Sequence, residues 1–357
     1  MIKVSVILPS LNVCKYIREC AVSVMNQNLK EIEIICVDAG SNDGTVQILE
    51  ELQRKDDRIR IIHSDRRSYG HQMNLGIDAA TGEYVGIVET DDFVSAEMYK
   101  GLYDYAKKTD ADVVKAPYFD FSNDSHQQIC YYADLFNERL PHDRSFSVKQ
   151  YGELLGYHAS VWSGIYKRSY LLENKIHFVE ADKAGYVDVG FRIDTCINTD
   201  KIAWYDKADY FYRRNAEGSS TNSFDLSVMN QRWKEAHEKF ESIKDDYDRY
   251  YAQYLVFDEY LNTIAYIGNM KVNTDQLETM ISNFSYVKTE SVIKSPVLTE
   301  RIRNRILRFK RDPYGYYRFR NLLYYPRIVF KTIANMVFPH GSEIRRKIKK
   351  LLLLNKG

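Results

Sequence analysis

The chain has 357 residues, of which 45% are hydrophobic and 28% charged, and its formal net charge is +1. This composition is that of a soluble globular protein with a large core domain and attachments. No apolar run reaches the ~20 residues that a membrane-spanning helix requires, and the five cysteines form no CxxC pair, which argues against a zinc site and favours reduced thiols.

The first 115 residues alternate short apolar runs with stretches whose apolar side chains recur at helical spacing. Such alternation predicts a mainly parallel sheet with helices on both faces. Because the first apolar run begins directly after Met1-Ile2-Lys3, we expect no signal peptide and a location in the cytoplasm. Strands are expected at 4–8, 32–37, 60–63, 84–89 and 112–115, and helices at 15–26 and 45–55.

Polar residues follow three of these strands. Residues 9–12 follow the first strand, residues 38–45 the second, and residues 89–92 the fourth. Ligands of doubly wound sheets bind at the carboxyl ends of the strands, so we expect the site here. Residues 40–45 are better explained as a turn that caps a helix. Asp38 ends an apolar strand, where a carboxylate can accept hydrogen bonds from a base or a ribose.

Three carboxylates lie within four residues in the segment Glu89-Thr90-Asp91-Asp92. Such charges repel one another unless a cation or a proton intervenes. Oxygen ligands suit Mg²⁺ or Mn²⁺, which also coordinate substrate phosphates and can neutralise the charge on a leaving diphosphate. The alternative is an acidic turn that caps the next helix, but Ser95 is the better N-cap. The segment therefore predicts a divalent cation site.

Four segments, in order and at the expected separations, resemble family 2 of the nucleotide-sugar glycosyltransferases, whose fold is called GT-A. The match is close over residues 1–115 and looser to about 222. The resemblance implies inverting transfer of a sugar from a nucleotide donor, expected to be UDP, to a saccharide or lipid-linked saccharide acceptor, with Mg²⁺ or Mn²⁺. It also implies a role in bacterial surface polysaccharide or glycoconjugate synthesis. The matching segments are 4–12, 37–45, 74–84 and 89–93.

The same resemblance assigns roles to individual residues. It implies that Asp91 touches the metal directly and that Glu89 serves the ribose or the metal. Ala39 replaces a second aspartate of the family, and Gln72-Met73 replaces an Ala-Arg pair, which removes a cation near the phosphates. His71 either substitutes for that cation or is a packed or solvent-facing histidine. The nucleotide-sugar site is expected to include Pro9, Ser10, Asn12, Asp38, Asn74, Glu89, Thr90 and Asp91.

For three further positions we expect a role in catalysis or in binding, and each has an alternative. Asp188 matches the general base that takes the proton of the acceptor hydroxyl, although it could instead be a helix N-cap. Trp162 either contacts the sugar acceptor or packs in the core. Arg213 or Arg214 is expected to neutralise the diphosphate, and the sequence does not decide between them.

The C-terminal residues are strongly basic. From Arg301 to the end, 16 Lys and Arg stand against two acidic residues, a net charge of +14, whereas the first 300 residues carry a net −13. Residues 343–354 have the pattern of a basic amphipathic helix, which suits an anionic membrane surface. Nucleic-acid binding or pairing with the acidic body are the alternatives. With the family resemblance, we expect a peripheral protein on the inner face of the cell membrane and no nucleic acid.

The division of the chain follows from these patterns. We expect a nucleotide-sugar-binding half at 1–115, an acceptor-binding half at 116–225, a helical region at 226–300 and a basic tail at 301–357. The departures at Ala39, Gln72 and Glu89 leave open a catalytically inactive nucleotide-sugar-binding module. The tail leaves open a membrane scaffold.

Overall fold

The computed structural model describes residues 1–121, 128–131, 136–156, 160–181, 185–214, 226–241, 274–295, 298 and 300–319. Contacts divide the chain into two compact units, Met1–Asp248 and Arg249–Gly357. The domain limits at residues 115, 225 and 300 stay predictions, and the basic amphipathic segment 343–354 lies outside the described residues. Within the described ranges, no helix is long and apolar enough to cross a membrane.

Unit 1 is built on a seven-stranded sheet with the strand order β10-β6-β9-β4-β1-β2-β3. Neighbouring strands are parallel except at β9, which runs antiparallel to both β4 and β6. The mainly parallel sheet predicted from the sequence is therefore confirmed. The strands are β1 (Val4–Ser10), β2 (Ile32–Asp38), β3 (Ile59–His63), β4 (Tyr84–Ile87), β6 (Val113–Lys115), β9 (Gly164–Lys167) and β10 (Ile202–Trp204).

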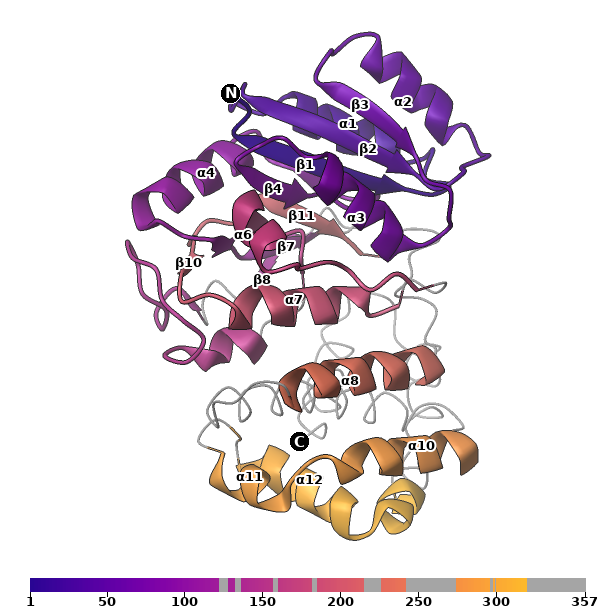
Figure 1. Ribbon diagram of the computed structural model, residues 1–357, viewed down its shortest axis with the longest axis vertical. Helices are drawn as coiled ribbons and strands as arrows, with labels where there is room; N and C mark the ends of the chain where they lie inside the picture. Colours follow the sequence, from indigo (N-terminus) through magenta and orange to yellow (C-terminus); the bar gives the residue numbers. More distant parts are fainter. Residues whose placement is uncertain are drawn as a thin grey trace, which may run out of the picture. The chain divides into compact units, whose positions relative to one another are not determined.

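Helices cover both faces of this sheet. The chain steps from β1 to β2 to β3 in one direction through α1 (Ile17–Met25) and α2 (Thr45–Gln53), and then returns to β4 through α3 (Tyr69–Ala79). Because crossovers between parallel strands are right-handed, this reversal places α3 on the opposite face. Figure 1 shows α3 in front of the strands, and the strand order reverses between β1 and β4, where a doubly wound sheet opens a ligand crevice.

The strand β4 approaches a helix very closely. The helix α4 (Met98–Thr109) carries Tyr99, whose ring is 0% exposed. A Cβ atom on Gly86 of β4 would lie 2.4 Å from Cε1 of this ring. Only a residue without a side chain leaves room for Tyr99, since protein interiors are close-packed.

A smaller sheet lies beside the end of β4, with the strand order β5-β11-β7-β8. Its strand β5 directly follows the acidic segment 89–92 and pairs antiparallel with β11. This pairing brings residues from about 120 positions further along the chain to the acidic segment. The strands are β5 (Phe93–Val94), β7 (Tyr118–Phe121), β8 (Gln128–Tyr131) and β11 (Tyr210–Arg213).

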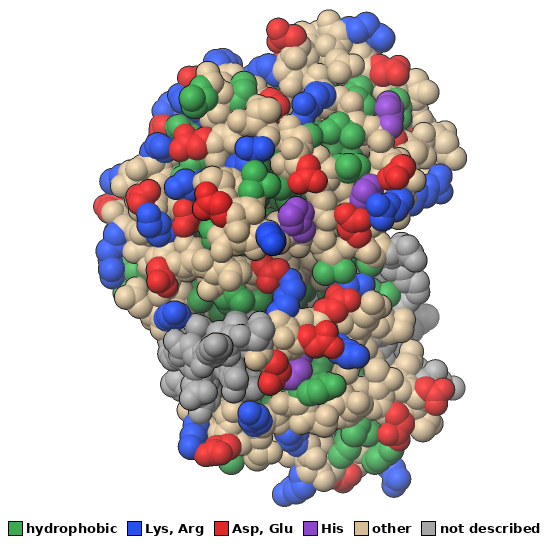
Figure 2. Space-filling model, in the orientation of Figure 1, with side chains coloured by type: hydrophobic (Ala, Val, Ile, Leu, Met, Phe, Trp, Pro, Cys, Tyr) green, Lys and Arg blue, Asp and Glu red, His purple; other side chains and the backbone are tan. Residues whose placement is uncertain are grey.

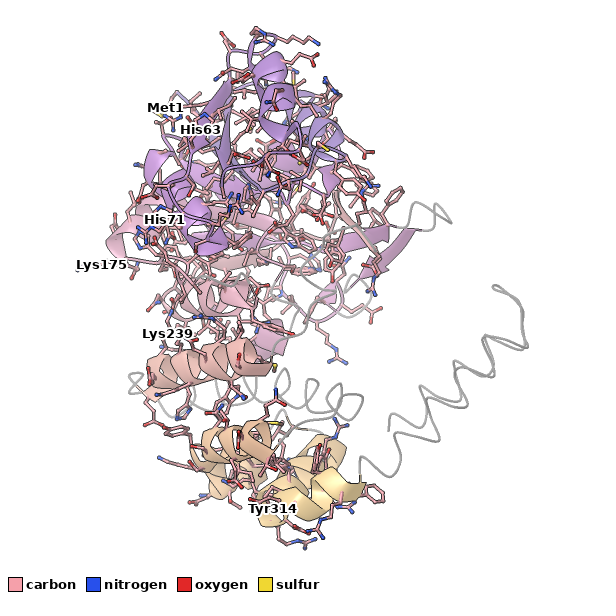
Figure 3. All side chains as sticks on the ribbon, turned by 90° about the vertical axis from the view of Figure 1, so that its right-hand side faces the viewer. Met1, His63, His71, Lys175, Lys239 and Tyr314 are labelled. Carbon is pink, nitrogen blue, oxygen red and sulfur yellow. The ribbon has the colours of Figure 1, made fainter. Side chains whose placement is uncertain are left out.

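The later helices complete unit 1. The helix α7 (Val187–Ile197) carries Asp188 and packs against α8 (Leu226–Glu241). Lys239 of α8, which is labelled in Figure 3, pairs with Asp194 of α7. Within the helical region predicted at 226–300, α8 covers residues 226–241, and residues 242–273 lie outside the described residues.

Unit 2 contains α10 (Thr274–Ser285), α11 (Thr289–Lys294) and α12 (Glu300–Arg311). The basic α12 buries an apolar face, since Ile306 is 0% and Phe309 1% exposed. The ring of Phe309 lies 4.4 Å from that of Phe284 on α10, measured between centroids. The beginning of the basic tail is therefore part of a packed helical unit, and it keeps Arg308 and Arg311 exposed.

We predict that Gly86→Ala lowers the free energy of unfolding by about 1–3 kcal/mol, because the added Cβ overlaps the ring of Tyr99. The matched control is Gly190→Ala on α7, whose Cβ would meet only Lys239 Nζ at 3.8 Å. Alanine is the better helix former, so this control should be neutral or up to ~1 kcal/mol stabilising. Urea denaturation measures both, and equal effects would contradict the close-packing argument.

Candidate active site

The carboxyl ends of β1, β2 and β4 meet at one edge of the sheet. Ser10 and Asp38 are partners in the register of β1 and β2. The hydroxyl of Thr90 donates to the carbonyl of Pro9 at 2.7 Å, which joins the acidic segment to the end of β1. The structure therefore brings together the three polar segments that the sequence singled out.

Asp38 is 1% exposed, and the chain itself occupies its carboxylate. Its Oδ1 accepts hydrogen bonds from the hydroxyls of Ser10 at 3.1 Å and Ser41 at 2.5 Å. Its Oδ2 accepts from the N–H groups of Gly40 and Ser41, both at 2.9 Å. Asp38 thus shapes the turn after β2, and its contact with a base or ribose stays a prediction.

Asn12 fastens that turn to the end of β1. Its N–H donates to the hydroxyl of Ser41, and its Oδ1 accepts from the N–H of Asn42, each at 2.9 Å. Gly44 is the N-cap residue of α2, and the carboxylate of Asp43 accepts from the N–H of Thr45 at 3.1 Å. The turn-and-cap interpretation of residues 40–45 is confirmed.

Glu89 lies just beyond the end of β4 and faces α3. Its Oε1 accepts a hydrogen bond from the hydroxyl of Tyr69 at 2.5 Å. Burial raises the pKa of Glu89 to about 8, and the charges of Asp91 and Asp188 add to this effect. The contribution of Asp188 shows that the candidate base on α7 lies within electrostatic range of the acidic segment.

The two aspartates of the acidic segment have different surroundings. Asp92 is 1% exposed, and its oxygens accept from the N–H of Arg213 and the hydroxyl of Tyr210, both at 2.7 Å. The carboxylate of Asp91 makes no hydrogen bond or ion pair with another residue in the part of the chain that the structure describes, and burial raises its pKa. Asp92 therefore anchors β11, whereas Asp91 remains for a ligand.

Arg213, not Arg214, faces the acidic segment. The side chain of Arg213 is 4% exposed, and it donates from Nε to the carbonyl of Asp91 at 2.8 Å and from Nη2 to Glu19 at 2.5 Å. Arg214 is 53% exposed and pairs with Asp120. The guanidinium of Arg213 also lies within 5.5 Å of the ring centroids of Tyr16, Phe93 and Phe121.

Glu89 and Asp91 are the carboxylates that remain for a cation. Within the described ranges, no group of three or more His, Cys, Asp or Glu side chains is arranged to hold a metal ion. Both of these carboxyls have a raised pKa, which a nearby cation would relieve. Magnesium-like ions commonly take one or two protein carboxylates and complete their coordination with water and substrate phosphates. The residues therefore fit a cation that binds together with a diphosphate.

Asp188 lies in the first turn of α7, whose N-cap residue is Tyr186. The alternative prediction that Asp188 is the N-cap is therefore wrong. Burial raises the pKa of Tyr69, and the charges of Glu89 and then of Asp188 add to this effect. Burial lowers the pKa of Lys115, and the charge of Asp188 opposes that shift. The role of Asp188 as a general base stays a prediction.

Trp162 is packed among tyrosines. Its indole is 5% exposed and stacks on the rings of Tyr210 at 4.1 Å and Tyr212 at 5.3 Å, measured between centroids. Tyr118 meets it edge-on at 4.7 Å. This packing favours the core alternative, and contact with an acceptor sugar stays a prediction.

Three residues of α3 contact partners far from them in the chain or near its first turn. Asn74 is 8% exposed, and its amide binds Phe178 and Glu180, which the sequence did not connect with it. The Nε2 of His71 lies 2.8 Å from Asp65, so His71 is paired with a carboxylate, as a packed histidine would be. The contact of Tyr69 with Glu89 was not predicted, because no local pattern in the sequence indicates which residue its hydroxyl reaches.

Comparisons with known proteins show what this chain is similar to. Residues 5–171 match the family model described as glycosyl transferase family 2. Over these residues the chain is similar to glycosyl transferase family 2. The matched residues include β1 to β9 and the acidic segment, and the match ends before α7 with Asp188.

Two bacterial relatives and one solved structure extend the match. The glycosyltransferase EpsJ of Bacillus subtilis is 30% identical over 218 residues, which cover 59% of this chain and 61% of EpsJ. The glycosyltransferase GlyG of Streptococcus pneumoniae is 28% identical over 237 residues, which cover 63% of this chain and 75% of GlyG. The structure of S. aureus TarS 1–349 in complex with UDP-GlcNAc superposes with a TM-score of 0.70 at 20% identity, covering 91% of this chain and 92% of that one. This likeness confirms the GT-A fold.

We predict that Arg213→Ala lowers the free energy of unfolding by about 2–3 kcal/mol, because it removes a charged hydrogen-bond donor and its ring contacts from a buried place. Arg18→Ala is the control, since the Arg18–Glu51 pair is exposed and should contribute at most about 1 kcal/mol. Thermal or urea denaturation compares the two, and equal losses would contradict the buried role of Arg213.

Proposed function

We propose that this protein transfers a sugar from a UDP donor to a saccharide acceptor with inversion at the anomeric carbon, using Mg²⁺ or Mn²⁺. One observation carries the proposal: Asp91 and Glu89 lie at the shared carboxyl edge of the sheet, and the carboxylate of Asp91 makes no hydrogen bond or ion pair with another described residue. The family match supports glycosyl transfer as the reaction. This match does not by itself identify the donor, the acceptor or the metal.

The donor would lie across the ends of β1, β2 and β4. The turn fixed by Asp38 and Asn12 offers backbone groups to the nucleotide, and Asn74 is assigned to the donor by the family resemblance alone. TarS, which shares this fold, has been solved with UDP-GlcNAc. We therefore place UDP-sugars first among the donors to test.

The residues divide the chemistry between them. Asp91 and Glu89 would hold the cation, which would neutralise the charge on the leaving diphosphate. Arg213 holds the carbonyl of Asp91 and so fixes the acidic segment. Asp188 accepts the proton of the acceptor hydroxyl while that oxygen forms a bond to the anomeric carbon and the bond from this carbon to the diphosphate breaks.

We predict that Asp188→Asn lowers kcat for transfer about 10²–10⁴-fold, because the base is lost, while UDP binding with Mn²⁺ is retained. Asp91→Asn should lower transfer at least about 100-fold and also weaken UDP binding in the presence of Mn²⁺. Chelation of the metal with EDTA should abolish transfer by the wild type. A UDP-release assay with a panel of UDP-sugars and saccharide acceptors measures these effects.

Asp104→Asn is the matched control for these substitutions, since Asp104 is an exposed carboxylate paired with Lys100 on α4. It should leave transfer unchanged. A wild type that binds UDP-sugars but turns none of them over would favour the inactive nucleotide-sugar-binding module. Transfer that survives Asp188→Asn would exclude Asp188 as the base.

A membrane surface is the second partner that we propose, with the inner face of the cell membrane as the place of action. Unit 2 exposes Arg308 and Arg311 on α12 and Arg318 beyond it. The guanidinium of Arg308 lies 4.6 Å from the ring centroid of Phe319, which is 43% exposed. Arginines beside exposed rings suit an anionic lipid surface. On the face that Figure 2 shows, acidic and basic side chains of unit 1 are interspersed.

We predict that replacing Arg308, Arg311 and Arg318 together by Gln weakens binding to vesicles with anionic lipid by about 100-fold. Each basic residue near such a surface contributes about 1 kcal/mol, so three contribute about 3 kcal/mol. The control replaces the exposed Lys55, Lys100 and Lys108 of unit 1 by Gln, with the same change of charge. Vesicle co-sedimentation measures binding of both triple variants. Equal losses of binding in the two variants, or no binding of vesicles by either of them, would contradict the proposal.

A further inference from the structure

A side-chain amide joins α3 to the segment that precedes α7. Nδ2 of Asn74 donates to the carbonyl of Phe178 and to Oε1 of Glu180, both at 3.0 Å. Oδ1 of Asn74 accepts from the N–H of Phe178 at 2.8 Å. One amide thus holds both backbone polar groups of Phe178, a residue 104 positions further along the chain.

Two further contacts keep this segment against α3. Oε2 of Glu180 lies 3.0 Å from Nδ1 of His71, labelled in Figure 3, and 3.1 Å from Nη1 of Arg66. A Cβ atom on Gly70 would lie 2.0 Å from the carbonyl oxygen of Val179. The helix and the segment are therefore so close that a residue without a side chain is required at the point of contact.

The ring of Phe178 connects the two halves of the candidate active site. It stacks on Phe191 of α7 with 4.0 Å between centroids, and it meets the ring of Tyr69 edge-on at 5.9 Å. Tyr69 donates its hydroxyl hydrogen to Glu89. Phe191 follows Asp188 by three residues on α7, so it lies on nearly the same face of the helix. A continuous set of contacts therefore runs from Glu89 to the helix of Asp188.

We propose that Asn74 is a positioning residue, which holds Phe178 between Tyr69 and Phe191 and thereby sets the place of Asp188 relative to Glu89 and Asp91. This role differs from the donor contact that the family resemblance implies, because the amide is already used by Phe178 and Glu180. The inference rests on the proposed function only in naming Asp188 as the base. A displacement of about 1 Å in such a group can cost about 100-fold in rate.

The test is Asn74→Ala, assayed for UDP-sugar transfer and for amide hydrogen exchange. We expect kcat to fall about 10–100-fold while the donor KM and the Kd for UDP with Mn²⁺ change less than about twofold. Exchange in the first turns of α7 should rise about tenfold, since the bonds that hold Phe178 are lost. Gln53→Ala is the control, because its amide likewise joins two elements, donating to the carbonyl of Ile59 at 3.1 Å. It should leave kcat and α7 unchanged.

A second pair of variants distinguishes loss of the Asn74–Glu180 contact from unfolding of the protein. Asn74→Asp sets a carboxylate against Glu180 and should reproduce the loss of kcat. Adding Glu180→Gln restores an amide–carboxylate pair, and it should recover at least about tenfold of the lost kcat if the bridge acts through this contact.

Two results would overturn the proposal. A raised donor KM at unchanged kcat would show that Asn74 contacts the donor instead. Unchanged kcat and unchanged exchange of α7 in a folded Asn74→Ala protein would show that the bridge positions nothing. A wild type without transfer would count against the proposed function alone, since hydrogen exchange of α7 still tests the bridge.

Discussion

The buried carboxylate of Asp92 is the contact on which the acidic segment depends. It sits at the end of β4, where it takes hydrogen bonds from the backbone of Arg213 and the hydroxyl of Tyr210. A buried carboxylate without such donors would be strongly unfavourable, so β11 has to lie here. With β11 in place, Arg213 reaches the carbonyl of Asp91, and the segment has one defined conformation.

With Asp92 held by Tyr210 and Arg213, the three neighbouring acidic side chains have different surroundings. Asp92 serves the fold, Glu89 is held by Tyr69, and Asp91 is left for a ligand. The burial that raises the pKa of Asp91 and Glu89 also makes a divalent cation favourable beside them. The hydrogen bonds to Asp92 thereby hold Asp91 and Glu89 in a place where a bound cation would balance their charge.

The helices then connect this site with the acceptor side. Tyr69 on α3 touches Glu89, Phe178 lies between Tyr69 and Phe191, and Phe191 lies one turn from Asp188. The proposed metal-binding and proton-accepting sides are thus linked by packed rings. Rings in close packing have few alternative positions, so this link is stiff.

The sequence by itself determined five strands of the large sheet, the helices α1 and α2, and the three polar segments at the strand ends. Periodicity and turn residues are local properties, which explains why β1, β2 and β4 and the cap of α2 were predicted correctly. The family resemblance then pointed to Asp91 and Asp188, whose roles stay predictions. Only the tertiary structure decided that Arg213 rather than Arg214 faces inward, that Trp162 is packed among tyrosines, and that Asn74 holds Phe178. These contacts join residues far apart in the chain, and no local pattern records which side chains meet when distant segments pack.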